Sequence, residues 1–328
     1  MIAALVTLLL SVFLCGCYLA LARRWRVIDR PNERSSHSVP TPHGGGLPLF
    51  AALLLGVALA AVSGLTWDTE YLVLLGLVMV LVATGVVDDL RGLPVGLRFV
   101  IYGLCALVAT DTLYPFFSVE FAFANWLLGA LAAVALLWLL NLYNFMDGID
   151  AFAAVQCIVA CAGVALIALQ RGADPAYMQF CLLVLAAQIG FLCWNWPPAR
   201  LFMGDAGSVP TGFLLGGLAL LGGMRGYVPL ACWAILLGPF IVDASTTLAW
   251  RMSTGQPFMR PHRMHAYQRL SRDLGGHRPV VLILIALLAL WLFPLAWLAG
   301  LYPKYGVLLV ILAYVPLLAG MAKAFKLG

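Results

Sequence analysis

Eleven apolar stretches, each about 18 to 24 residues long, constrain this chain more than any other feature of its sequence. A helix needs roughly 20 such residues to cross the hydrocarbon core of a bilayer. The composition, with 63% hydrophobic and 10% charged residues and a mean hydropathy of +1.00, excludes a soluble globular protein. The expected spans are residues 2–22, 46–64, 70–87, 97–113, 122–142, 152–169, 177–195, 208–224, 227–249, 279–300 and 304–322.

The positive charges predict how these spans are oriented. Positive charge follows the first apolar run instead of preceding it, which indicates an uncleaved span with its N-terminus outside. From that start, 16 of the 19 Lys and Arg residues face the cytoplasm, and Arg171, Arg225 and Lys304 lie outside. This asymmetry follows the positive-inside rule. The predicted fold is an all-α polytopic membrane protein, a single catalytic domain over residues 1–328 with a cytoplasmic C-terminus and its chemistry on the cytoplasmic face.

Polar side chains gather in the stretch from Asn195 to Ser208, between two long apolar runs. It holds an amide, a cation and a carboxylate, at Asn195, Arg200 and Asp205. Two successive prolines are expected to end the preceding helix, because neither donates a backbone hydrogen bond. Glycines on both sides of Asp205 permit positive φ and close approach of a ligand. The stretch therefore indicates an ion or phosphate site.

Further acidic residues lie at the cytoplasmic ends of other spans. Asp88 and Asp89 end the third span, and two adjacent carboxylates need a cation or a proton between them. Asn144, Asp147 and Asp150 are spaced to share one helical face. A solvated helix end and a plain helix-linking turn are the simpler alternatives.

These carboxylates together favour a hard cation. Asp88, Asp89, Asp147, Asp150 and Asp205 would mostly protonate in a low dielectric unless a cation neutralised them. Oxygen ligands favour Mg²⁺, or Mn²⁺ in its place.

The longest cytoplasmic loop is basic and contains two histidines, His262 and His265, among arginines that include Arg260 and Arg263. Such packed cations suggest a phosphate-bearing partner, although the positive-inside rule alone would also make this loop basic. The glycine run at Gly44 and Gly45 could form a backbone nest for an anion, or simply a hinge. Acidic metal ligands and arginines on one membrane face indicate transfer of a phosphorylated group.

These motifs, in this order, resemble the polyprenyl-phosphate N-acetylhexosamine-1-phosphate transferases, the MraY/WecA-like enzymes of glycosyltransferase family 4. The resemblance rests on Val-Val-Asp88-Asp89, Asn144-Phe-Met-Asp147-Gly-Ile-Asp150, Asn195-Trp-Pro-Pro-Ala-Arg-Leu-Phe-Met-Gly-Asp205-Ala-Gly-Ser, His262-Arg-Met-His265 and Thr41-Pro-His-Gly-Gly-Gly46. It covers nearly the whole chain.

The resemblance implies that a UDP-N-acetylhexosamine donates sugar-1-phosphate to undecaprenyl phosphate, giving the lipid diphosphate sugar and UMP. It makes Asp205 the Mg²⁺ ligand and places Asp88 and Asp89 at the lipid phosphate, with Asp88 as the base or nucleophile. Asn144 and Asn195 would line the same centre. Asp147 and Asp150 would orient the nucleotide, while His262 and His265 would contact the donor's diphosphate or sugar. The remaining residues expected to bind substrate are Arg98, Arg200, Arg260, Arg263, Gly44 and Gly45.

Two departures from the family pattern bear on the donor. Arg263 and Met264 separate the two histidines, a version similar to that of O-antigen initiating enzymes, and Arg98 takes a basic position that is often lysine. We therefore expect an enzyme of lipopolysaccharide or O-antigen synthesis in the bacterial inner membrane. Its partners would be the bilayer and its two substrates, without nucleic acid, and a homodimer is compatible with this picture.

Two other functions would also place acidic residues in membrane helices. A CDP-alcohol phosphotransferase also places aspartates in membrane helices, but the sequence after Asp147 does not continue with that class's pattern. A transporter of an anionic or phosphorylated solute would bury ionisable groups near the membrane centre. Here nearly all of them lie at one face, with Asp111 and Asp243 as the exceptions.

Overall fold

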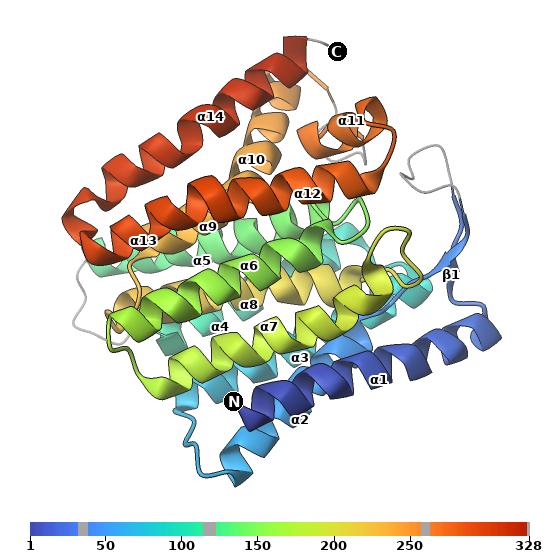
Figure 1. Cartoon of the computed structure of the whole chain (residues 1–328), viewed down its shortest axis with the longest axis horizontal. Helices are drawn as coiled ribbons and strands as arrows, with labels where there is room; N and C mark the ends of the chain where they lie inside the picture. The colour runs from blue at the N-terminus through green and yellow to red at the C-terminus, as the bar shows by residue number, and fades with distance from the viewer. Residues whose placement is uncertain (32–38, 114–122, 257–262, 327–328) are drawn as a thin grey trace.

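Long helices lying side by side make up most of the molecule (Figure 1). The computed structural model describes residues 1–31, 39–113, 123–256 and 263–326. The helices are α1 (Ile2–Trp25), α2 (Gly46–Val62), α3 (Thr69–Arg91), α4 (Val95–Leu113), α5 (Phe123–Phe145), α6 (Phe152–Gln170), α7 (Pro175–Asn195), α8 (Asp205–Met224), α9 (Leu230–Leu236), α10 (Gly238–Ser253), α11 (Ala266–Asp273), α12 (His277–Leu287), α13 (Phe293–Leu301) and α14 (Gly306–Lys326). A π-helical turn, Leu288–Leu292, joins α12 to α13, and a 3₁₀ turn, Pro303–Tyr305, precedes α14. Two short strands, β1 (Ile28–Asp29) and β2 (Thr41–Pro42), pair antiparallel.

The prediction of an all-α polytopic membrane protein is confirmed. Within the described residues, nine helical segments are long and apolar enough to cross a bilayer. The predicted second span is the 17-residue helix α2, and the predicted ninth span is the pair α9 and α10. The count of eleven spans, their orientation and the single catalytic domain remain predictions.

The ninth predicted span, residues 227–249, differs from the straight helix that was expected. It breaks at Leu237, and α9 and α10 are bent by 71°. Pro239 explains the break, because it lacks the N–H that would continue the helical ladder. The bend turns α10 across the direction of the other long helices (Figure 1), and α10 packs against α5 and α14.

Helix α8 forms the centre of the bundle. Every residue from Ala206 to Gly222 is buried, and α8 packs against α3 and α5. Glycines allow this close packing, since a Cβ on Gly46 would lie 2.2 Å from the Gly207 Cα and one on Gly85 would lie 2.4 Å from the Ala206 nitrogen. The first turn of α8 is thereby held between α2 and α3.

The strand pair connects to the loop that enters α8. The Phe202 N–H donates to the Pro42 carbonyl, and the Gly45 and Gly46 N–H groups donate to the carbonyls of Phe202 and Met203, each at 2.9 Å. The segments that lead into α2 and α8 are therefore joined by backbone hydrogen bonds.

The outermost helices present apolar side chains outward. Large exposed hydrophobic residues occur along α1, α4, α5 and α14, such as Phe13, Leu104, Leu131 and Leu308. In an aqueous protein such surfaces would aggregate, but against lipid they need no cover. The chain is a multi-pass membrane protein.

Candidate active site

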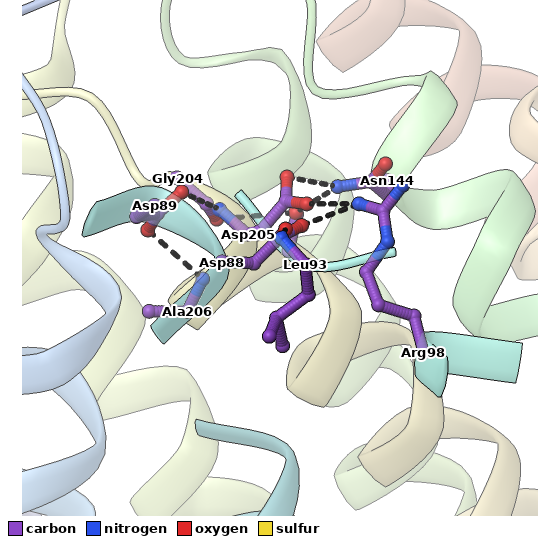
Figure 2. A network of polar contacts seen from close by, with 9 residues as sticks. Asp88, Asp89, Leu93, Arg98, Asn144, Gly204, Asp205 and Ala206 are labelled. Atoms are coloured by element: carbon purple, nitrogen blue, oxygen red, sulfur yellow. Dashed lines mark hydrogen bonds and ion pairs between the residues drawn. The ribbon is translucent and has the colours of Figure 1, made fainter. Parts of the chain in front are cut away.

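Asp205 begins α8 and lies at the centre of a polar network (Figure 2). Gly204 precedes it with φ of 72°, the conformation that the sequence suggested for a glycine here. Asp89, from the end of α3, accepts the Asp205 N–H at 3.1 Å and the Ala206 N–H at 3.3 Å. Asp89 therefore caps α8, because a carboxylate stabilises the positive end of a helix dipole.

Asp88 has a different set of contacts from its neighbour. Its Oδ2 accepts a hydrogen bond from Arg98 Nη1, and its Oδ1 accepts the Leu93 N–H at 2.6 Å. The same Arg98 nitrogen lies 3.3 Å from Asp205 Oδ2. One guanidinium thus joins two carboxylates that would otherwise repel one another (Figure 2). The predicted contact of Arg98 with substrate stays a prediction.

Asn144 connects α5 to this network. Its Nδ2 donates to Asp205 Oδ1 and to the Ser208 Oγ, both at 2.8 Å. The Ser208 hydroxyl donates in turn to the Gly204 carbonyl at 3.1 Å. Ser208 was not assigned a role from the sequence, although its position three residues after Asp205 puts both on one face of α8.

Asp147 lies in the turn after α5 and is partly exposed. Burial, followed by the nearby carboxylates of Asp205, Asp89 and Asp150, raises the pKa of Asp147 well above that of an ordinary carboxyl group. Its position beside the network supports the predicted contact with substrate.

The donor atoms at this site suit a hard divalent cation. Asp88 and Asp205 offer oxygens to one point, which Arg98 Nη1 now contacts. Mg²⁺ often uses one or two carboxylates and takes its remaining ligands from water and substrate phosphates. Within the described part of the chain, no three His, Cys, Asp or Glu side chains converge as a metal site. The residues therefore fit a metal that is completed by substrate.

The prediction that Asn195 lines the same centre is wrong. Asn195 is buried, its Oδ1 accepts the Ala151 N–H at 2.8 Å, and its Nδ2 donates to the Leu201 carbonyl at 3.0 Å. Both ends of the amide are engaged with backbone. Asn195 holds the loop before α8 against the start of α6.

Asp150 serves the same loop. Its buried carboxylate accepts the Ala199 N–H at 3.0 Å, and Oδ2 lies 3.1 Å from His277 Nδ1. These contacts fix the loop to α12. Asp150 therefore holds the loop before α8 in place. This geometry corrects the expectation that Asp150 orients the nucleotide directly.

His265 is held by a carboxylate that lies 22 residues earlier. Asp243 Oδ1 lies 3.1 Å from His265 Nδ1 and accepts the Ala266 N–H at 3.2 Å, while its Oδ2 accepts the Tyr267 N–H at 3.1 Å. Asp243 thereby caps α11 from α10. The Tyr267 hydroxyl donates to the Phe145 carbonyl at 2.9 Å, so α11 is fixed beside the end of α5.

Two of the predicted substrate contacts are not formed as expected. Arg200 is exposed, stacks 4.7 Å above the Trp194 ring and donates to the Cys193 carbonyl, so its described contacts are with the end of α7. Gly45 uses its N–H on the Phe202 carbonyl, so the backbone nest proposed for Gly44 and Gly45 does not offer both N–H groups to an anion. Both glycines instead permit close packing, since a Cβ on Gly44 would meet the Tyr18 hydroxyl and one on Gly45 would meet the Phe191 ring.

The basic loop is described only in part. His262 and Arg260 lie outside the described residues, and Arg263 is partly exposed just before α11. His43, which was quoted in the glycine-rich motif but given no role, lies near the network. Burial lowers the pKa of His43, although the Asp29 and Asp205 carboxylates favour its charged form.

Comparison with known proteins identifies a matching family model and several similar proteins. Residues 71–223 match the Glycosyl transferase family 4, a range that contains Asp88, Asp89, Asn144 and Asp205. The chain is 29% identical over 291 residues to the probable undecaprenyl-phosphate N-acetylglucosaminyl 1-phosphate transferase of Bacillus subtilis, covering 86% of this chain and 80% of the relative.

Two further relatives have related names. The decaprenyl-phosphate N-acetylglucosaminephosphotransferase of Mycobacterium tuberculosis is 26% identical over 317 residues, covering 86% of this chain and 78% of the relative. The phospho-N-acetylmuramoyl-pentapeptide-transferase of a Synechococcus species is 32% identical over 232 residues, covering 65% and 66%. The match to Glycosyl transferase family 4 thus contains the aspartates and Asn144 that meet at the start of α8.

Proposed function

We propose that this protein transfers N-acetylhexosamine-1-phosphate from a UDP-sugar to undecaprenyl phosphate and releases UMP. The names of the relatives support a polyprenyl-phosphate acceptor and a phosphosugar donor. The observation that carries the proposal is the network of Asp88, Arg98, Asn144 and Asp205 at the start of a buried helix.

In this reaction, an oxygen of the lipid phosphate attacks the phosphorus that bears the sugar. A new P–O bond forms to the lipid, and the bond from that phosphorus to the oxygen of UMP breaks. The attacking phosphate is already anionic, so it needs orientation and charge compensation more than deprotonation. Asp88 would act as a base toward the lipid phosphate. Alternatively, its carboxylate would attack the phosphorus that bears the sugar and release UMP, and the lipid phosphate would then take the phosphosugar from Asp88.

Arg98 would compensate the phosphate charge. The Arg98 guanidinium can bind phosphate oxygens as it binds the two carboxylates. The first N–H groups of α8 do not share this role, because they already donate to Asp89 and to the Gly204 carbonyl.

Mg²⁺, or Mn²⁺, would be held by Asp205 and would take its remaining ligands from water and substrate phosphates. When bound, the metal would offset the charge of the donor diphosphate. Asn144 would keep the Asp205 carboxylate oriented toward it. Asp147, in the partly exposed turn beside these groups, would contact the nucleotide.

Family resemblance and charge asymmetry support the remaining details. The active site would face the cytoplasm from the bacterial inner membrane, and the product would begin a cell-surface glycan of the O-antigen or lipopolysaccharide type. The separated histidines of the basic loop favour this glycan class.

The test is UMP release by detergent-purified protein supplied with undecaprenyl phosphate, Mg²⁺ and a panel of UDP-N-acetylhexosamines. UMP should appear only when lipid and one of these donors are present. It should disappear when EDTA removes the metal and in Asp205→Asn.

Asp68→Asn is the matched control, because Asp68 is exposed at the start of α3 and also loses one carboxylate. It should retain wild-type activity. A folded protein that releases no UMP from any donor, or one whose activity survives Asp205→Asn, would contradict the proposal.

A further inference from the structure

One cavity of the described structure is lined by residues outside the aspartate network. A cavity of about 790 Å³ lies between α10, α11, α12 and α14. Its volume is within the roughly 300–1,000 Å³ typical of ligand sites. The wall is mainly apolar, with residues such as Val242, Val280, Leu284, Leu287 and Leu317.

Cations also line this cavity. Arg263, Arg269, Arg272 and Lys323 are among its lining residues, against two carboxylates, Asp243 and Asp273. The Asp243 carboxylate already accepts the N–H groups that begin α11. The cavity therefore combines an apolar wall with an excess of positive charge.

The apolar and the charged parts occupy different depths. Lys323 lies near the end of α14 and His277 begins α12, and these ends lie on the side of the molecule where α11 is found (Figure 1). From there the lining continues along α12 from Val280 to Leu287, about 10 Å at 1.5 Å per residue. On α14 it extends back from Lys323 to Pro316, over a similar length. The cavity is thus an apolar slot with cations at its membrane-surface end.

We propose that this slot binds an anionic glycerophospholipid of the surrounding bilayer. One acyl chain would lie between α12 and α14, and the phosphate would face Arg272 and Lys323. Basic pockets between membrane helices on the cytoplasmic side bind anionic lipid head groups for this reason. A zwitterionic lipid offers the same chain without the net charge. None of the network residues Asp88, Arg98, Asn144 and Asp205 lines the slot, but Arg263, an expected substrate contact, does, so the slot adjoins the proposed transfer site at the basic loop.

The charge requirement can be tested by native mass spectrometry of the full-length protein in detergent. The protein is titrated with phosphatidylglycerol and, separately, with phosphatidylcholine that has the same acyl chains. We expect one saturable phosphatidylglycerol adduct, weakened at least about tenfold by Arg272→Gln combined with Lys323→Gln. Arg23→Gln with Arg24→Gln removes the same charge from exposed positions at the end of α1 and should leave binding within about twofold of wild type.

The acyl-chain requirement is tested by filling the slot. Gly320 lines it, and a Cβ built there meets no atom within 4 Å, so Gly320→Leu adds volume to the slot without a clash at that atom. It should abolish the adduct. Gly76→Leu, on α3, is the matched control, because a Cβ there also meets nothing within 4 Å. Equal binding of the two lipids, an adduct that survives Gly320→Leu, or displacement of phosphatidylglycerol by equimolar undecaprenyl phosphate would overturn the proposal.

Discussion

At the residue scale, the site depends on how one arginine shares two carboxylates. Asp88 and Asp205 come from different helices and contact the same Arg98 nitrogen. Two carboxylates this close repel one another unless a cation lies between them. A bound divalent metal or a substrate phosphate would change how their charge is compensated. Asp88 and Asp89 are adjacent but have different contacts. Asp88 binds Arg98, whereas Asp89 caps α8.

Replacing Arg98 should affect catalysis strongly. We expect Arg98→Gln to lower kcat for UMP release by about 10²-fold, because a charged donor to phosphate is lost and the carboxylates are left uncompensated. Arg98→Lys keeps the charge but not the forked geometry and should recover part of the rate. The rates of both variants are measured alongside their thermal unfolding. Wild-type kcat in folded Arg98→Gln would show that the bridge has no role.

Sequence reasoning found the residues of the centre but not the division of labour among polar groups. Asp88, Arg98, Asn144 and Asp205 carry the family motifs, and these four meet in the structure. Asn195 belongs to the same motifs yet binds only backbone among its described contacts. Tertiary neighbours decide which amide or carboxyl group makes hydrogen bonds to the backbone of a buried loop. Motif spacing does not specify those neighbours.

At the element scale, the close approach of three helices fixes the start of α8. Gly85 on α3 lies against the Ala206 backbone, and Gly46 on α2 lies against Gly207. Backbone atoms cannot move aside as a flexible side chain can. The Asp89 cap therefore depends on glycine at these contacts.

The substitution Gly85→Ala should destabilise the protein by about 1–3 kcal/mol, because its Cβ would lie 2.4 Å from a backbone nitrogen. The matched control is Gly76→Ala, nine residues earlier in the same helix, where a Cβ meets nothing within 4 Å. Thermal unfolding in one detergent compares the two. If both variants unfold at the same temperature, the contact does not limit packing there.

Helix α11 provides the second prediction at this scale. Asp243 holds His265 and two N–H groups of α11, so Asp243→Asn should loosen that helix and reduce kcat/KM for the sugar donor by about tenfold. Hydrogen exchange in residues 266–273 should rise while exchange in α8 stays unchanged. Asp273→Asn, an exposed change on α11 itself, is the control. Unaltered exchange in Asp243→Asn would refute the capping role.

The helices themselves were largely predictable, and their breaks were less so. Apolar length located the spans, and the proline pair correctly ended α7 at Asn195. The 71° bend between α9 and α10 was missed, although Gly238 and Pro239 are there in the sequence. Hydropathy indicates which residues lie in lipid but does not register a change in the direction of the helix axis. It therefore predicted one straight span.

At the scale of the whole molecule, the proposed reaction requires the aspartates, α11 and the basic loop to lie on one side of the membrane. In the structure α11 lies beside the end of α5 that carries Asn144, so these elements share one end of the bundle. The charge asymmetry predicts that this end faces the cytoplasm.

Cysteine labelling tests this orientation. In a parent in which the exposed cysteines Cys17 and Cys193 are serine, Thr66→Cys should react with an impermeant maleimide in intact cells. Leu274→Cys should react only after permeabilisation, because it follows α11 on the opposite side. The reverse pattern would invert the proposed topology.

The most direct measurement of the central claim follows the phosphate itself. The protein is incubated with undecaprenyl phosphate, Mg²⁺ and UDP-N-acetylglucosamine labelled with ³²P on the phosphate next to the sugar. The account predicts label in the extracted lipid and unlabelled UMP in the aqueous phase. Label that stays in a water-soluble nucleotide while sugar reaches the lipid would show that the bond to the sugar breaks instead, and would contradict phosphosugar transfer.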